Sequence, residues 1–310
     1  MINTKKLTCS ILGMVVVLGM MTAESCAFDP RTGTTGLQVL KIPAGVRPMA
    51  MGEAFAAVAD DVNSIYWNPA GLARVERRQL NISYNSWLSD ISYANVGYAQ
   101  PVEGIGTFAA SINYLYLGNF IGRDNAGAST SNFTGYDLMI DLSYGKKIIQ
   151  NMAAGLNVKL IQEQIEDEAL FTWAADIGLL YNLSSSLSLG LAVQNIGSGA
   201  QYTSASAIDP LPLNIKAGLG YKPSDVLLVA LDVNIPNDNT VSAGIGMEYW
   251  IMEVLALRAG YKTNRINDLG ALSGICAGIG FKQDNYNIDF AFTPYADLGN
   301  AYRVSLGLCF

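Results

Sequence analysis

Charged side chains recur singly along this chain, at positions where a β-strand would turn them toward its less apolar face. Such groups could line a polar path for a solute, or they could pair with one another inside a closed fold. No serine, cysteine or carboxylate stands in a recognisable catalytic arrangement. The charges on this face are Asp137, Asp141, Lys159, Asp176, Lys216, Asp232, Glu248, Arg258, Lys262, Lys282, Asp289 and Arg303.

The chain contains no histidine, which removes several chemistries at once. A histidine-based triad, a histidine-ligated zinc or haem and a histidine general base are all excluded. We therefore expect no enzyme, no metal site and no cofactor. The net charge is −7 and no basic stripe is present, so we expect no nucleic-acid binding.

Two further patterns could carry chemistry, and each has a plainer interpretation. Glu163, Glu166, Asp167 and Glu168 could supply oxygen ligands to a hard cation, although such a run is more often a solvated turn. The pairs Gly104/Gly106, Gly218/Gly220, Gly244/Gly246 and Gly278/Gly280 lack the spacing of a nucleotide-binding loop. Glycines two apart share one face of a strand, so these pairs predict close backbone packing there.

The elements that position these residues are strands. Half of the 310 residues are hydrophobic and 15% are charged, and from about Leu80 the apolar residues fall at every second position, which is typical of a membrane β-barrel. We predict an all-β fold, a transmembrane antiparallel β-barrel of about fourteen strands. The expected strands are 79–87, 91–100, 105–117, 133–146, 151–163, 169–183, 186–196, 211–222, 225–235, 240–250, 253–262, 271–282, 286–294 and 301–310.

The connections between these strands sort by position. Longer links follow four of the odd strands, at 118–132, 197–210, 263–270 and 295–300, and tight turns follow even strands. The other three odd links, near 88–90, 164–168 and 236–239, are short, so the sorting is a tendency. Long loops at one end and short turns at the other are typical of outer-membrane barrels. An aromatic girdle at the lipid interface is also expected, from Tyr84, Tyr144, Tyr181, Tyr221, Tyr249 and Tyr261.

Both ends of the chain carry export signals. Lys5 and Lys6 precede a short apolar run and the small residues Ser25-Cys26-Ala27, which predicts a signal peptide over residues 1–27. A lipoprotein acylated at Cys26 and a retained anchor stay open as alternatives. The last strand ends on an aromatic residue and resembles the sorting signal that barrel-assembly machinery reads. That signal comprises Tyr302, Val304, Leu306, Leu308 and Phe310.

Residues 28–78 break the strand pattern. Small residues from Met51 to Ala59 could form a short helix or strand, and Asp60 or Asp61 could cap a helical turn through Tyr66. Asn68-Pro69 would end that turn, because the residue before proline avoids the helical region. We divide the chain into the signal peptide (1–27), an N-terminal segment (28–78) and the barrel (79–310).

The N-terminal segment resembles the signature of the FadL-like outer-membrane barrels, and specifically their PorV/PorQ branch. The matching positions are Gly45, Met51, Gly52, Ala54, Phe55, Ala59, Asp60, Asp61, Tyr66, Trp67, Asn68, Pro69, Ala70, Gly71 and Leu72. The resemblance implies a fourteen-stranded barrel in the outer membrane of a Gram-negative-type (diderm) bacterium. It also implies that this segment folds into the lumen as a hatch.

The resemblance implies two classes of function. Some relatives import fatty acids or hydrocarbons, which predicts passive uptake of a small hydrophobic molecule, with local apolar pockets near Trp87, Leu115 or Trp250. Others bind exported proteins in a secretion system, which predicts an interaction barrel. A barrel lipase or protease is the third option, and the absence of histidine disfavours it. The expected partners are outer-membrane lipid, barrel-assembly machinery, and either a hydrophobic small molecule or an exported protein.

Overall fold

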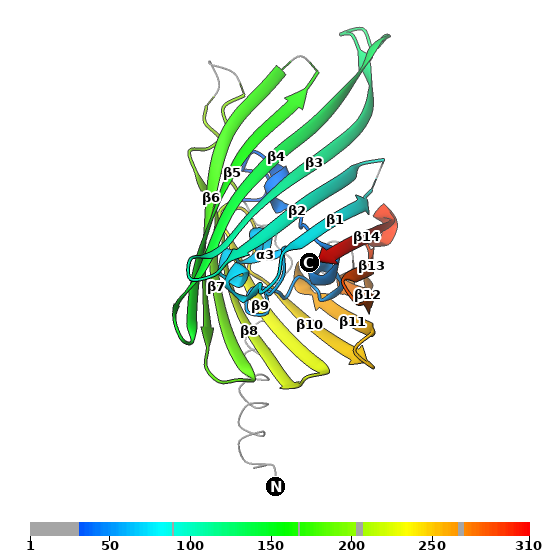
Figure 1. The fold of residues 1–310 in the computed structure, drawn as a ribbon. Coiled ribbons are helices and arrows are strands. Elements are labelled where there is room, and N and C mark those ends of the chain that lie inside the picture. Colours follow the sequence, from blue (N-terminus) through cyan, green and yellow to red (C-terminus); the bar gives the residue numbers. More distant parts are fainter. Residues whose placement is uncertain (1–30, 89, 167, 203–206, 266–269) are drawn as a thin grey trace.

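The computed structural model describes residues 31–88, 90–166, 168–202, 207–265 and 270–310, so the expected signal peptide lies outside the described residues. The chain forms a closed antiparallel barrel in which each strand pairs with its sequence neighbours and β1 pairs with β14 (Figure 1). The strands are β1 (Gln79–Ser86), β2 (Ser92–Val102), β3 (Gly106–Arg123), β4 (Ser129–Ile149), β5 (Met152–Ile165), β6 (Glu168–Asn182), β7 (Leu187–Gly197), β8 (Asn214–Ser224), β9 (Leu227–Pro236), β10 (Ser242–Ile251), β11 (Leu255–Lys262), β12 (Ile275–Gln283), β13 (Tyr286–Pro294) and β14 (Asn300–Cys309).

Helices are short and lie mainly in the N-terminal segment. They are η1 (Gln38–Lys41), α2 (Val46–Ala50), α3 (Ser64–Trp67), η2 (Pro69–Arg74), η3 (Thr263–Arg265), η4 (Ala271–Gly274) and η5 (Ala296–Leu298). In the part of the chain that the structure describes, no helix has the length and apolar content that a membrane span requires.

The strands bury their polar faces and expose their apolar faces. In β1, Asn81, Ser83 and Asn85 are buried, whereas Ile82 and Tyr84 are about half exposed (47% and 50%). The same inversion holds in β14, where Arg303 and Ser305 face the interior. An apolar exterior around a polar interior is the pattern of a barrel in lipid, so the predicted transmembrane fold is confirmed.

The predicted strands match the observed ones closely except at the loop end of β3 and β4. The expected long link 118–132 is wrong, because both strands continue into it and only residues 124–128 connect them. β3 continues past its last pair with β2 at Tyr116, its pairing with β4 shifts register between Tyr116 and Asn119, and this hairpin projects beyond its neighbours (Figure 1). The start of β12 was also misplaced, because Ala271–Gly274 forms a 3₁₀ turn instead of strand.

Residues 31–78, here called the luminal segment, run through the interior of the barrel (Figure 1). The expectation of a helix or strand over 51–59 is wrong. These residues form successive turns, and the helix α2 lies just before them. The turns lie directly against the barrel wall where its inner face is glycine. A Cβ on Gly190 would overlap the carbonyl of Ala56, and one on Gly246 would overlap that of Met51.

Candidate functional site

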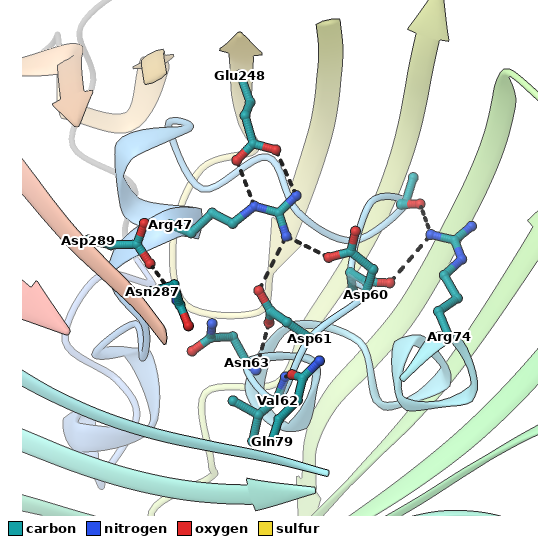
Figure 2. Close-up of polar contacts among 12 residues, drawn as sticks. Arg47, Asp60, Asp61, Val62, Asn63, Arg74, Gln79, Glu248, Asn287 and Asp289 are labelled. Atoms are coloured by element: carbon teal, nitrogen blue, oxygen red, sulfur yellow. Dashed lines mark hydrogen bonds and ion pairs between the residues drawn. The ribbon is translucent and has the colours of Figure 1, made fainter. Parts of the chain in front are cut away.

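A ladder of alternating charges joins the luminal segment to the barrel wall (Figure 2). Arg47 binds both oxygens of Glu248 on β10, at 2.8 and 2.9 Å, and also contacts Asp60 at 2.5 Å and Asp61 at 3.2 Å. Glu248 in turn accepts from Arg258 of β11 at 2.7 Å. Arg258 continues to Asp289 of β13 at 2.5 Å. Each charge in this row therefore has an opposite neighbour, which burial requires of Glu248 and Arg258.

Asp61 organises the turn that follows it. Its carboxylate accepts from the Asn63 backbone N–H at 2.8 Å, and α3 begins one residue later at Ser64. The expected cap of this helix by an aspartate is wrong, since Asn63 is the N-cap residue and makes no side-chain cap. Burial is the largest influence on the Asp61 carboxyl and raises its pKa from 3.8 to about 6, although Arg47 acts to lower it. α3 ends before Pro69, as predicted.

The opposite wall carries a second buried network. Asp141 on β4 accepts from Ser111 and Asn113 of β3, at 2.7 and 2.6 Å. Asn157 of β5 bridges Asp141 to Asp176 on β6. Lys159 pairs with Asp176 at 2.9 Å and is 1% exposed. These side chains satisfy one another across the wall, as buried polar and charged groups require.

Three wall charges hold the middle of the luminal segment. Asp232 of β9 accepts the backbone N–H groups of Phe55 and Ala56, at 2.9 and 2.8 Å. The Lys216 ammonium lies 4.4 Å from the centre of the Trp67 ring, a cation–π contact. Lys262 of β11 pairs with Glu53. Because Glu53 has a positive φ of 65°, this ion pair holds a backbone turn that a non-glycine residue rarely adopts.

An apolar cluster, here called the outer cluster, lies between the start of the luminal segment, the loop-end halves of β2 to β6 and the connection between β7 and β8. Its buried members are Leu37, Val39, Leu40, Ala44, Tyr93, Leu115, Met139, Ile161, Leu170, Ala174, Ala200 and Leu211. Polar contacts beside the cluster join the luminal segment to Asp238, which follows β9. Lys41 pairs with the Asp238 carboxylate at 2.7 Å, and the Thr35 hydroxyl donates to the same carboxylate at 2.6 Å. An apolar solute would make favourable apolar contacts with the side chains of the outer cluster.

A cavity of about 1030 Å³ opens at the turn end of the barrel. The luminal segment forms its inner wall with Arg47, Asp60 and Arg74, and the barrel contributes Trp250 and Lys282. Arg74 donates to the Ala57 carbonyl at 2.9 Å and to the Asn182 side chain at 2.7 Å, which ties the luminal segment to β6. The cavity and the outer cluster therefore lie on opposite sides of the luminal segment.

The structure brings most of the candidate residues together. Met51, Gly52, Phe55, Trp67, Asn68, Pro69, Ala70 and Gly71 pack inside the barrel, and Gly45 lies so close to Asn63 that a side chain there would overlap it. Tyr66 is half-buried and donates to the Leu40 carbonyl. The wall charges are buried apart from Lys262, which is partly exposed, and Lys282, which is exposed on the cavity. Leu115 lies in the outer cluster, whereas Trp87 contacts Arg303 and Tyr295 near the loop end.

Other predictions need correction. The acidic run extends beyond one turn, since Glu163 lies within β5 and Glu168 begins β6; Glu166 and Glu168 are exposed, as a solvated turn predicts, and Asp167 lies outside the described residues. Gly104/Gly106 lies at a turn away from the luminal segment. Sequence reasoning also missed Lys41, Glu53, Arg74 and Asp238, and above all Arg47. Arg47 could have been recognised in the sequence as an isolated cation in an apolar stretch, thirteen residues before the adjacent aspartates Asp60 and Asp61.

This chain matches one protein family and is similar to several known proteins. The family model described as "Type IX secretion system protein PorV" matches residues 25–236. A curated relative, a UPF0164 protein of Treponema pallidum, is 22% identical over 292 residues, covering 86% of this chain and 67% of the relative. The toluene transporter TbuX of Ralstonia pickettii has a TM-score of 0.61 at 15% identity, over 86% of this chain and 97% of TbuX. A FadL homologue of Pseudomonas aeruginosa has a TM-score of 0.57 at 11% identity, over 86% and 98%.

Proposed function

The chain belongs to the PorV family, and from this membership and the fold we propose that it is an outer-membrane channel for passive passage of small hydrophobic compounds. The turn end, which also holds the last residue of β14, would face the periplasm, and the loop end would face outward. The luminal segment would act as the hatch between them. The fold and the family are those of channel-type barrels, and a fold alone does not name a solute.

The observation that carries the proposal is the outer cluster. Several apolar clusters lie inside the barrel, and the one beneath the loop end presents Leu37 and Leu40 of the luminal segment against Leu115 and Leu170 of the wall. An apolar solute could replace Leu37 and Leu40 against this wall with little loss of apolar burial. Below that level, the luminal segment separates the outer cluster from the cavity at the turn end. Passage therefore requires the segment to move.

The hatch can be tested by locking it. A Cβ on Gly36 would lie 3.0 Å from the Ala200 Cβ, near the 3.5–4.5 Å of a disulfide. We expect Gly36→Cys with Ala200→Cys, in a chain with Cys276→Ser and Cys309→Ser, to lose uptake of radiolabelled toluene and oleate when oxidised. Reductant should restore uptake. The measurement uses diderm cells that lack a channel of their own for these compounds.

The single-cysteine variants, Gly36→Cys and Ala200→Cys, serve as controls, and oxidant should leave their uptake unchanged. If the oxidised double variant transports at the rate of the reduced protein, the luminal segment is not the gate. If none of the variants transports more than cells without the protein, the channel proposal itself is refuted.

A second candidate is an interaction barrel for exported proteins. The family description favours it, and so does the projecting β3–β4 hairpin. Among the described residues, β2 pairs with β3 only as far as Tyr116, which leaves the β3 edge from Leu117 to Arg123 without a partner on that side. An open strand edge can accept an extended peptide. Native mass spectrometry of the protein from its own membranes would favour this candidate if a protein co-purifies and is lost on deletion of residues 118–131.

A further inference from the structure

Two carboxylates face each other at the edge of the outer cluster. Asp137 of β4 lies directly opposite Glu163 of β5 in the register, and both side chains point into the barrel. Asp137 is only 4% exposed. Like charges directly opposite each other on paired strands destabilise a sheet, so this pair lowers the stability of the barrel wall.

The pair lacks the cation that neutralises buried carboxylates such as Asp176 and Asp289. Asp176 pairs with Lys159, and Asp289 pairs with Arg258. Among the described residues, no cation forms an ion pair with Asp137 or Glu163, and the Asp137 Oδ1 atom is buried without a hydrogen bond. Within the described part of the chain, the Tyr202 hydroxyl forms a hydrogen bond with Glu163. That hydroxyl also accepts the backbone N–H of Leu37 at 3.3 Å, which connects the pair to the luminal segment.

The surroundings of the pair are apolar. Leu115 of β3 lies opposite Asp137, and Leu170 of β6 lies opposite Glu163. Both leucines belong to the outer cluster, together with Leu37 of the luminal segment. The geometry thus places two carboxyl groups that have no cation partner at one end of an apolar surface. A ligand that matches both features has an apolar body and a single cationic head.

We propose that Asp137 and Glu163 form a head-group subsite, and that the hydrophobic compounds this channel prefers are small apolar amines, cationic at neutral pH. This rests on the function proposed above and specifies its substrate class. A bound ammonium would donate to the open Asp137 oxygen and offset both charges. A calcium ion fits less well, because it takes six to eight oxygen ligands. Among the described residues, no three acidic, histidine or cysteine side chains converge as a metal site.

Three ligands that share one ring but differ in charge test this subsite. We would measure dissociation constants of 2-phenylethylamine, 2-phenylethanol and phenylacetate for the full-length protein in nanodiscs, using isothermal titration calorimetry. The amine should bind about tenfold or more tightly than the alcohol, and the anion should bind more weakly than the alcohol. Asp137→Asn keeps the side-chain shape and should abolish the preference for the amine. Asp225→Asn, at the exposed turn end, should leave it unchanged.

Each outcome decides a different claim. If the amine and the alcohol bind within twofold of each other, the subsite is refuted while the channel for hydrophobic compounds stands. If the preference survives both Asp137→Asn and Glu163→Gln, these residues do not form the head-group site. If calcium chloride binds in their place and the amine shows no preference, the pair is a metal site. If none of the three ring compounds binds, both this inference and the proposed function are wrong.

Discussion

At the scale of single residues, Arg47 joins the luminal segment to the barrel wall. It contacts three carboxylates, one on the barrel wall and two within the segment, while 14% of its side chain stays exposed. Burial acts to lower the pKa of the Arg47 guanidinium, but the three carboxylates together raise it well above its ordinary value, so the side chain stays cationic. A planar guanidinium can bind a carboxylate with two parallel hydrogen bonds, which lysine cannot do. The fit between Arg47 and Glu248 therefore fixes orientation as well as charge.

Arg47→Met should loosen the luminal segment without unfolding the barrel. The substitution leaves Arg258 as the only cation paired with Glu248 among the described residues, and it leaves Asp61 without its cation. We expect the free energy that holds the luminal segment against the barrel wall to fall by about 3 kcal/mol. Amide hydrogen exchange over residues 46–62 should then accelerate about a hundredfold. Arg123→Met, in the exposed β3–β4 hairpin, is the matched control. Unchanged exchange in the Arg47 variant would show that the ladder does not hold the segment.

At the scale of elements, the luminal segment depends on the glycines of the wall beneath it. Gly155 of β5 and Gly178 of β6 lie under Asn68, Pro69 and Ala70, and a Cβ on either would overlap them. Glycine weakens an isolated strand, so its use here indicates that close packing of the segment offsets that cost. Asn68 completes this contact by donating to the Ala56 and Leu179 carbonyls, at 2.7 and 3.1 Å.

Gly155→Ala should therefore displace residues 68–70 while the barrel stays assembled. Overpacking of this kind costs about 1–3 kcal/mol. Limited proteolysis should show cleavage within the luminal segment, although the heat-modifiable band on gels persists. The same substitution in a variant lacking residues 45–73 gives the control. There it should be neutral or stabilising to the barrel, because nothing remains for the methyl group to overlap. A similar loss of stability in both backgrounds would mean that the glycine serves the strand itself.

The strands could be predicted from the sequence and the course of the luminal segment could not, for one physical reason. Each strand faces lipid on one side and the barrel interior on the other. Its own residues therefore alternate between apolar and polar types, as Tyr302 and Arg303 do. The luminal segment is surrounded by protein, and its small residues show no period. Its turns at Met51 to Ala59 depend on distant partners such as Asp232, which no local pattern reveals. The extension of β4 to Ser129 was missed because Ser129 to Asn132 are all exposed and polar.

At the scale of the whole molecule, the barrel exists only when its last strand meets its first. β14 pairs with β1 from Cys309 to Tyr302, and the backbones of Phe310 and Arg78 exchange two further hydrogen bonds, at 3.0 and 3.1 Å. The Phe310 ring stacks on Tyr98 of β2, with centroids 6.5 Å apart, so it reaches past β1 on the outer face. The final residue thus contributes to closure as well as to the expected assembly signal.

Phe310→Asp should impair closure and assembly together. A carboxylate at the lipid interface loses the aromatic contact with Tyr98 and adds a charge that the membrane disfavours. We expect the amount of heat-modifiable protein in the outer membrane to fall severalfold. Leu298→Asp makes the same kind of change at an exposed position of the loop end and should assemble normally. Refolding of purified Phe310→Asp into vesicles separates the two roles. Normal refolding without the cellular machinery would assign the residue to recognition alone, whereas slow refolding would show that Phe310 is needed to close the sheet.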